Sequence, residues 1–586
     1  RMRKHNYSPH RGSLTRFDRE FYSPSERFTY IGSGELGGKA HGLARVKGIL
    51  DSRFREAYAP DIEIAIPPLT VITTDMFDLF MKENGLYETA YALSRDDVIA
   101  HEFQRASLPV QLVGDLRALV EQVHAPLAIR SSSLLEDAMF EPFASVYATK
   151  MVPNNQPDAD ARFRKLAEAV KFVYASTFFR SARNYMKATH HATIDEKMAV
   201  IIQEIVGTRF DDRYYPHVSG VLRSYNFYPV GYAKPEDGVA ELALGLGRTI
   251  VDDGVSWPFS PAYPKIDPPF KSLRDMLKHT QTRLWAVNMG KSPAYDPTNE
   301  NEYLVRCGID EAEYDGAIRH IASTYIPSDD VVEMGIGPRG PRVIDFSPIL
   351  KAGVLPLGEL LRTLKETCED MLGAMVEVEF AMRLGRELAA PAFFGFLQVR
   401  PMVVSTAAVD IDETEFAGER ALLSSETVLG NGVLETIRDV VYVDPERFDV
   451  LKSHEIASEI ERLNAPLVEA RRPYLLIGFG RWGTTDPLGG IPVDFGQISG
   501  AAVIVEASLP NLPFTLSQGS HFFHNVTSFK ILYFSVRHAG ERGIDWDWLR
   551  RQERRSDGVF ASRVELASPL LVKVDGRCGR GVILHG

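Results

Sequence analysis

A glycine-rich turn near the N-terminus is the feature that most restricts how this chain can fold. The segment Tyr30–Ala40 reads YIGSGELGGKA and begins inside a short apolar run, Phe28–Ile31. Glycines let a backbone turn sharply and approach a neighbouring group closely, and a following helix supplies unpaired N–H groups for an anion. The segment therefore predicts a strand, a tight turn and a helix, as in α/β folds, with the positive charge of Lys39 at the turn.

Three interpretations of this turn stay open on its own residues. Gly32, Gly34 and Gly37 form a G-x-G-x-x-G pattern, which alone is a weak indication of a dinucleotide-binding fold. The turn is not a Walker loop, because Ser33 occupies the first glycine position and Ala40 replaces the metal-binding Ser or Thr. A plain strand-to-helix turn that binds nothing is the third interpretation.

The segment Leu127–Asp137 carries a more specific signal. It reads LAIRSSSLLED, so a strand-like run ends in Arg130 and is followed by three serines and two acids. An arginine in this position is suited to hold a polyphosphate through fork-like hydrogen bonds. Taken alone, the block could equally form a helix cap with a surface ion pair.

A pair of acids near the middle of the chain is a candidate for binding a metal ion. Glu377 and Glu379 lie two residues apart, so on a strand their side chains share one face. Carboxylate and amide oxygens are ligands that Mg²⁺ prefers, together with phosphates. The segment Phe396–Pro401 follows and reads FLQVRP. Acids on a solvated strand face are the alternative interpretation.

Other segments predict a mixed α/β chain. Residues 160–188 and 357–384 have the pattern of helices, and residues 250–300 are rich in Pro, Asp and Ser, which is typical of a long loop or an inserted lobe. The predicted strands are Ile62–Ile66, Leu127–Ile129, Met198–Ile205, Val218–Leu222 and Phe393–Val399. A helix around 454–463 and a glycine-rich β-type region at 474–534 follow a linker at 404–415.

Together these segments resemble the nucleotide-binding half of phosphoenolpyruvate synthase and pyruvate phosphate dikinase. Gly37–Ala44 is similar to the family's GGKxxxL opening, Ile66–Thr74 to VPPGFVITT, Leu127–Asp137 to VRSSATAED and Phe396–Pro401 to LQxRP. The chain departs from the family in three places. Ser145 replaces a glycine, the usual Phe–Thr pair after Leu222 is missing, and Arg248 stands where GLGE has glutamate.

The resemblance implies an α/β (α+β) fold, with a two-lobed ATP-grasp module and a smaller C-terminal α/β domain. We expect an N-terminal arm at 1–27, a first lobe at 28–215, a second lobe at 216–405 and a C-terminal domain at 416–586. The last is interpreted as a divergent phosphohistidine swivelling domain.

The resemblance also implies ATP and Mg²⁺ as cofactors and assigns residues to them. The nucleotide-binding residues carried over are Lys39, Gly37, Gly38, Arg130, Gln203, Glu204, Glu241, Gln398 and Arg400. Glu377, Glu379 and Gln398 are carried over as metal-side residues. Arg130 and Arg400 are expected to contact phosphate during catalysis.

The C-terminal third matches the family less well. Dikinases carry phosphate on a histidine in a TSHAA motif, and the nearest analogue here is Ser517–His524, with His521 as the candidate carrier and His524 as a lesser one. A hydrogen-bond network or a pair of metal ligands are the alternatives. Gly478–Pro487 could bind an anion or form a rigid loop held by Trp482.

Composition limits the class of protein. The 78 acidic and 66 basic residues give a net charge of −12, which argues against a dedicated nucleic-acid binder. We find no apolar run long enough for a membrane span, and three widely spaced cysteines favour a reducing cytoplasm. The expected partners are ATP and an unidentified small-molecule or protein acceptor, with room for a partner domain or a homo-oligomer.

Three functions are consistent with the sequence. The first is Mg-ATP-dependent phosphotransfer, through a phosphohistidine at His521, to an unknown acceptor. Because no segment resembles the (β/α)₈ barrel of those enzymes, we do not expect this chain alone to interconvert pyruvate and phosphoenolpyruvate. The second is a catalytically degenerate, ATP-binding regulatory or scaffold protein. The third, which rests on Gly32–Gly37 alone, is a dinucleotide-dependent oxidoreductase.

Overall fold

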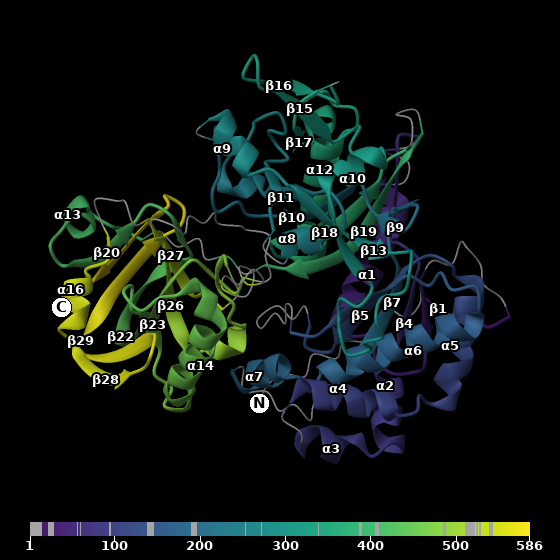
Figure 1. The fold of residues 1–586 in the computed structure, drawn as a ribbon, viewed down its shortest axis with the longest axis horizontal. Helices are drawn as coiled ribbons and strands as arrows, with labels where there is room; N and C mark the ends of the chain where they lie inside the picture. Colours follow the sequence, from purple (N-terminus) through teal and green to yellow (C-terminus); the bar gives the residue numbers. More distant parts are fainter. Residues whose placement is uncertain are drawn as a thin grey trace.

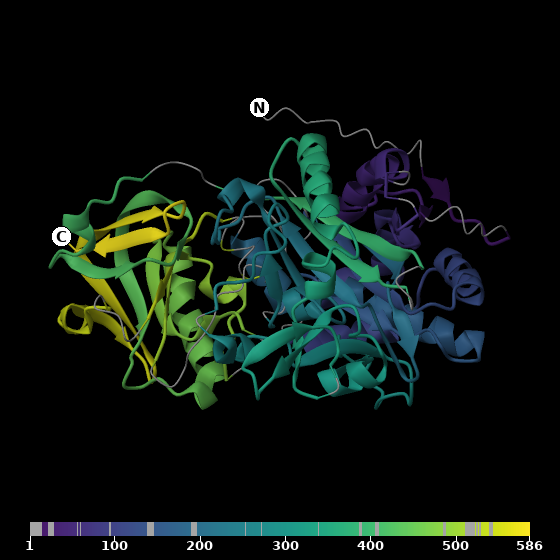
Figure 2. The same ribbon diagram turned by 90° about the horizontal axis from the view of Figure 1, so that it is seen from above.

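The computed structural model contains two sheet-based lobes and a C-terminal domain beside them (Figures 1 and 2). The residues that it describes are 14–20, 28–54, 57–58, 60–92, 95–136, 146–188, 196–251, 254–270, 272–337, 339–385, 390–402, 404, 409–484, 488–509, 522, 526, 529–537 and 543–585. None of the helices formed by these residues is long and apolar enough to cross a membrane. The mixed α/β class predicted from the sequence is confirmed.

The first lobe is built on a six-stranded sheet with the order β1-β2-β4-β7-β5-β6. β2 and β4 are parallel, whereas the β4–β7, β7–β5 and β5–β6 pairs are antiparallel. A dinucleotide fold requires a mostly parallel, doubly wound sheet, so that interpretation of Gly32–Gly37 is wrong. The strands are β1 (Thr15–Arg16), β2 (Phe28–Ile31), β4 (Leu69–Ile72), β5 (Leu127–Ser133), β6 (Thr149–Val152) and β7 (Met198–Glu204).

Helices cover the first sheet because their apolar faces pack on it and on one another. α6 lies against β5 and β6, α4 and α5 pack on α6, and α2 contacts β7. The predicted helix at 160–188 is confirmed, with a break between α6 and α7. The helices are α2 (Thr74–Glu83), α3 (Leu86–Ala92), α4 (Asp96–Arg105), α5 (Val110–Gln122), α6 (Ala159–Ser176) and α7 (Arg180–Ala188).

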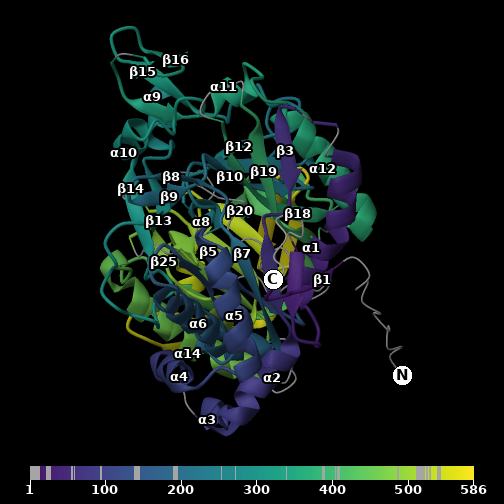
Figure 3. The same ribbon diagram turned by 90° about the vertical axis from the view of Figure 1, so that its right-hand side faces the viewer.

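The second lobe is built on another six-stranded sheet, with the order β12-β11-β10-β18-β19-β3. Helices α1 (Gly38–Ile49) and α12 (Leu357–Leu372) both pack against this sheet (Figure 3). β3 comes from the range 28–215 but pairs with β19, so this strand crosses the predicted division between the lobes. The strands are β3 (Ile62–Ala65), β10 (Val218–Arg223), β11 (Val239–Ala243), β12 (Trp257–Phe259), β18 (Val376–Arg383) and β19 (Ala392–Pro401).

Two smaller sheets extend the second lobe. One of their strands, β13 (Arg283–Asn288), lies in the range 250–300 together with β12 and α9 (Leu273–Lys278), so this range contains regular structure and is not one long loop. The four-stranded sheet has the order β14-β13-β9-β8, and the three-stranded sheet has the order β16-β15-β17. Their strands are β8 (Thr208–Phe210), β9 (Arg213–Tyr215), β13 (Arg283–Asn288), β14 (Leu304–Gly308), β15 (Ala322–Ile326), β16 (Val331–Met334) and β17 (Arg342–Ile344). The short helices nearby are α8 (Arg248–Val251), α9 (Leu273–Lys278), α10 (Ile309–Tyr314) and α11 (Ser347–Leu350).

The predicted helix at 357–384 is correct only in its first part. Gly373 takes the left-handed conformation, with φ 65°, at the C-terminus of α12 and ends the helix there. The chain then enters β18, where valines alternate with glutamates. Strand formation is favoured because the valines, Val376 and Val378, are buried in the second-lobe core.

The described residues of the C-terminal domain form a nine-stranded sheet, in which β22, β23, β26 and β27 run parallel, and a small two-stranded sheet of β24 and β25. The helix predicted at 454–463 is confirmed as α14 (Ser453–Glu469), which packs on the sheet. The strands are β20 (Ala421–Ser425), β21 (Val428–Leu429), β22 (Asn431–Val443), β23 (Tyr474–Phe479), β26 (Ala501–Ala507), β27 (Leu532–Val536), β28 (Glu553–Asp557), β29 (Ala561–Asp575) and β30 (Arg580–Leu584). Smaller elements are β24 (Arg481–Trp482), β25 (Gly490–Ile491), α13 (Glu413–Phe416) and α16 (Trp546–Arg550).

The C-terminal domain contacts the first lobe through α7. Arg180 at the start of α7 forms an ion pair with Glu461 on α14. Tyr185 packs against Phe495 and Phe529, whose rings stack with their centroids 4.6 Å apart. An aromatic cluster therefore joins the C-terminal domain to the first lobe.

Helix α1 begins in close contact with the end of β5, and glycines make this contact geometrically feasible. A Cβ atom on Gly37 would lie 1.6 Å from the carbonyl oxygen of Ser132, and one on Gly38 would lie 1.7 Å from that of Glu136. Gly37 also has a positive φ of 77°. By contrast, a Cβ on Gly48 in the same helix would meet nothing within 4 Å.

We predict opposite effects for alanine at two glycines of α1. Gly38→Ala should lower the free energy of unfolding by roughly 1–3 kcal/mol, since the added methyl group overpacks against fixed backbone. Gly48→Ala should leave stability unchanged or raise it by up to about 1 kcal/mol, because alanine restricts the unfolded chain. Urea denaturation of both variants checks this, and equal midpoints would contradict the packing role of Gly38.

Candidate functional site

Arg130 joins the two lobes. It lies on β5 of the first sheet, and its guanidinium reaches β18 and β19 of the second sheet. Nη2 donates to Oε1 of Gln398 at 2.7 Å and lies 3.3 Å from Oε2 of Glu379, while Nη1 donates to the carbonyl oxygen of Leu397 at 3.0 Å. The Arg130 and Glu379 side chains are only 13% and 17% exposed. Low exposure strengthens this charge pairing.

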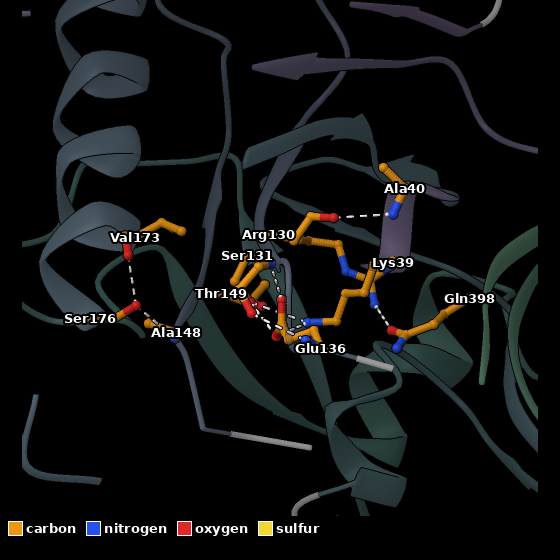
Figure 4. A network of polar contacts seen from close by, with 12 residues as sticks. Lys39, Ala40, Arg130, Ser131, Glu136, Ala148, Thr149, Val173, Ser176 and Gln398 are labelled. Atoms are coloured by element: carbon orange, nitrogen blue, oxygen red, sulfur yellow. Dashed lines mark hydrogen bonds and ion pairs between the residues drawn. The ribbon is translucent and has the colours of Figure 1, made fainter. Parts of the chain in front are cut away.

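Lys39 lies beside Arg130 on the first-lobe side. Its Nζ is 2.6 Å from Oε1 of Glu136 and 3.1 Å from Oγ of Ser131, the residue that follows Arg130. Oγ of Ser132 accepts the N–H of Ala40 and so fixes the first turn of α1. Figure 4 shows Lys39, Arg130 and Gln398 gathered in one place. The structure thus brings Lys39, Arg130, Glu379 and Gln398 together.

The backbone N–H groups of the glycine loop are hydrogen-bonded to side chains of the protein itself. The carboxylate of Asp75 accepts the N–H groups of Ser33 and Gly34 at 2.9 and 2.8 Å, and Oγ1 of Thr74 accepts the N–H of Glu35. Burial raises the pKa of Asp75, but hydrogen bonds from Thr73, Ser33 and Gly34 outweigh it, so the net pKa is lowered. Asp75 therefore takes the place that an anion would have at this loop.

Gln203 on β7 presents an unsatisfied donor beside Arg130. Its Oε1 lies 3.5 Å from Nη1 of Arg130, and its Nε2 is buried without a hydrogen-bond acceptor among the residues that the structure describes. A buried polar atom of this kind requires an explanation, and a missing ligand is one. Of the other residues assigned to the nucleotide, Glu204 ends β7, and Glu241 on β11 accepts a hydrogen bond from Ser256 at 2.6 Å.

Glu377 and Arg400 bind each other. Oε1 of Glu377 accepts Nε of Arg400 at 2.6 Å, and Oε2 accepts Nε of Arg223 at 2.5 Å. The three residues are direct neighbours on β10, β18 and β19, and all are buried. Arg223 stands where the family has the phenylalanine of its Phe–Thr pair. Glu377 is thus bound to Arg223 and Arg400, whereas Glu379, on the same face of β18, contacts Arg130.

A second buried acid, Glu196, lies near Glu136. Burial, with a smaller contribution from the negative charge of Glu136, raises the pKa of Glu196 to about 7. Glu196 precedes β7 and has an exposed fraction of only 3%. Glu136, which is paired with Lys39, therefore has a buried neighbouring carboxyl group whose pKa is raised.

The candidate functional residues of the C-terminal domain lie only partly within the described residues. His521 and His524 lie outside the described residues, as do Thr485, Asp486 and Pro487. In the preceding part of Gly478–Pro487, Trp482 is buried, and its Nε1 donates to the carbonyl oxygen of Val505 at 3.1 Å. This favours the interpretation of a loop held by its tryptophan.

Three residues that form contacts at the site were not assigned a role from the sequence: Glu136, Asp75 and Arg223. Glu136 is part of the arginine–serine–acid block, so its spacing from Arg130 could have indicated it. Asp75 and Arg223 lack such a signal, because their partners are far away in the chain. Among the described residues, no group of three or more His, Cys, Asp or Glu could hold a metal ion.

Two α/β lobes that meet across a lysine, an arginine, a carboxylate and a glutamine define a nucleotide-binding module of the ATP-grasp type. The model of the family described as "Pyruvate phosphate dikinase, AMP/ATP-binding domain" matches residues 33–420. The chain belongs to this family. No curated protein matches the sequence significantly.

Proposed function

We propose that the protein is a Mg-ATP-dependent phosphotransferase whose triphosphate lies between Lys39 and Arg130 on one side and Glu379 and Gln398 on the other. The observation that carries the proposal is the contact of Arg130 with Glu379 and Gln398 across the two lobes. Family membership supports ATP or AMP as the nucleotide. Positioning and charge neutralisation are the main requirements of phosphoryl transfer.

The residues fit a nucleotide in two respects. Lys39 and Arg130 supply positive charge within one small region, and an arriving phosphate would replace Glu136, Glu379 and Gln398 as their partner. The buried Nε2 of Gln203 would gain the acceptor that it lacks among the described residues. β7, which carries Gln203 and Glu204, would border the base.

The residues also fit a magnesium ion, with a smaller protein donor set than expected. Mg²⁺ is usually held by one or two carboxylates plus substrate phosphates, and Glu379 with Gln398 supplies one carboxylate and one amide oxygen. Glu377 is a poor candidate because Arg223 and Arg400 occupy both of its oxygens. When bound, the ion would neutralise charge on the phosphates.

We further propose that His521 carries the phosphoryl group to a small-molecule or protein acceptor, as the resemblance to dikinases implies. An imidazole is nucleophilic and titrates near neutral pH, which suits this role. Lys39 and Arg130 would hold and orient the phosphates, and they would keep the negative charge of the transferred group compensated.

A specific observation favours a second candidate, an ATP-binding regulatory or scaffold protein without turnover. Arg223 and Arg400 neutralise Glu377, an acid that the family resemblance assigns to the metal. Arg248 also reverses the charge expected after the GLG segment. Both changes reduce the negative charge available for a metal ion.

Arg130→Met should weaken MgATP binding by roughly 10- to 100-fold, since a hydrogen bond to a charged group contributes about 1.5–3 kcal/mol. Isothermal titration calorimetry measures this. Arg95→Met is the matched control, because Arg95 is exposed and pairs with Asp97 away from the site. Equal affinities of the Arg130 variant and wild type, with both proteins folded, would refute the proposed phosphate site.

His521→Ala should abolish acid-labile labelling of the protein by ATP radioactive in its β- and γ-phosphates. His454→Ala, an exposed histidine at the start of α14, should label like wild type. Chromatography of the nucleotide products distinguishes AMP, which indicates dikinase chemistry, from ADP. Unchanged labelling of the His521 variant would exclude it as the carrier. Binding without label or product in wild type would support the regulatory candidate.

A further inference from the structure

The loop of residues 289–303 connects the lobes at a second place. It joins β13 to β14 in the second lobe but lies on β6 and α6 of the first lobe. β6 is the last strand of the first sheet, and no strand formed by the described residues pairs with its outer edge. A loop that covers such an edge satisfies backbone groups that would otherwise be exposed.

A buried ion pair holds the second half of this loop. Nζ of Lys150 on β6 lies 2.8 Å from Oε2 of Glu302, and the two side chains are only 1% and 2% exposed. The same Nζ donates to the carbonyl oxygen of Pro297 at 2.9 Å. Burial lowers the pKa of Lys150, although Glu302 opposes this effect. Breaking a buried pair by removing one partner is strongly unfavourable.

The loop also contacts the strand position next to Arg130. Oε1 of Glu300 accepts the backbone N–H of Thr149 at 2.9 Å, and Thr149 is paired in register with Arg130. The neighbouring Asn301 accepts a hydrogen bond from Arg248, whose guanidinium lies over the ring of Trp285 at 5.4 Å. Arg248, the departure from the family's glutamate, therefore holds the loop from the second-lobe side.

Further contacts extend the attachment along α6 and β6. The hydroxyl of Tyr295 donates to Oε1 of Glu168 at 2.9 Å. Nζ of Lys165 donates to the hydroxyl of Tyr303 at 3.0 Å and also lies over its ring, 4.3 Å from the centroid. The attachment therefore includes about one turn of α6, from Lys165 to Glu168.

We propose that loop 289–303 is a clasp that holds the two lobes together before any nucleotide binds, with Lys150 as a positioning residue. Through Glu302 and Glu300, Lys150 fixes the edge strand that carries Thr149. It thereby fixes the position of Arg130 opposite Glu379 and Gln398. The clasp itself rests on contacts within the protein, whereas its effect on affinity rests on the proposed nucleotide site.

The distance between the lobes tests the clasp without nucleotide. Spin labels on Val110→Cys in the first lobe and Tyr314→Cys in the second report this distance, since both side chains are more than four-fifths exposed, at 83% and 84%. Cys578→Ser removes the exposed native cysteine, and Cys307 and Cys368 are buried. Double electron–electron resonance spectroscopy should give one narrow distance distribution for the doubly labelled protein without further substitutions.

Lys150→Met should give a broader and longer distance distribution. Glu300→Ala removes the acceptor of the Thr149 N–H but keeps the buried pair intact. This variant should give a smaller change in the same direction, and it remains informative if Lys150→Met does not fold. Lys291→Met, an exposed lysine in the same loop, is the matched control and should leave the distance unchanged. Unchanged distributions in both the Lys150 and the Glu300 variants would overturn the clasp.

Calorimetry with MgATP tests the positioning role. A displaced Arg130 should weaken binding roughly tenfold or more in Lys150→Met, since small displacements of a binding group have large effects. The double variant Lys150→Met/Glu302→Gln, which leaves no buried charge unpaired, should recover folding stability but not affinity. If both the folding stability and the MgATP affinity recovered, Lys150 would contribute to stability alone and would have no positioning role. Absence of MgATP binding in wild type would refute the nucleotide site and leave the distance result as the test of the clasp.

Discussion

The contact of Arg130 with Glu379 and Gln398 is the interaction on which the rest of the site depends. It pairs a cation from one sheet with oxygens from the other in a region with little solvent. In such surroundings an uncompensated charge is costly, so Arg130 has to be neutralised either by the protein or by a ligand. The same side chain therefore joins the lobes and, in the proposed site, would bind the polyphosphate.

The glycines near the N-terminus have a different role from the one their pattern indicates. Gly37 and Gly38 allow α1 to approach the backbone after β5, which brings Lys39 to Ser131 and Glu136. The N–H groups of Ser33 and Gly34 are bound by Asp75. In the proposed site the phosphate-binding charges are supplied by Lys39 and Arg130, and the glycine loop positions Lys39.

The strands around the site were predictable from local patterns, and the meeting of Lys39, Arg130, Glu379 and Gln398 was implied by the resemblance to the family. The triad of Arg223, Glu377 and Arg400 was not. It depends on the register of three strands that are far apart in the chain, and a shift of one residue would place each side chain on the other face. The end of helix α12 at Gly373 was missed because the alternation in β18 is short and borders a strong helical pattern. The role of His521 in the C-terminal domain stays a prediction.

The central claim is that one triphosphate occupies the space between Lys39 and Arg130 and the Glu379–Gln398 pair. A crystal structure with Mg²⁺ and a non-hydrolysable ATP analogue tests it most directly. The account predicts phosphate oxygens within hydrogen-bonding distance of Lys39 Nζ and the Arg130 guanidinium, with Arg130 released from Glu379. An analogue bound elsewhere, with the contact between Arg130 and Glu379 unchanged, would contradict it.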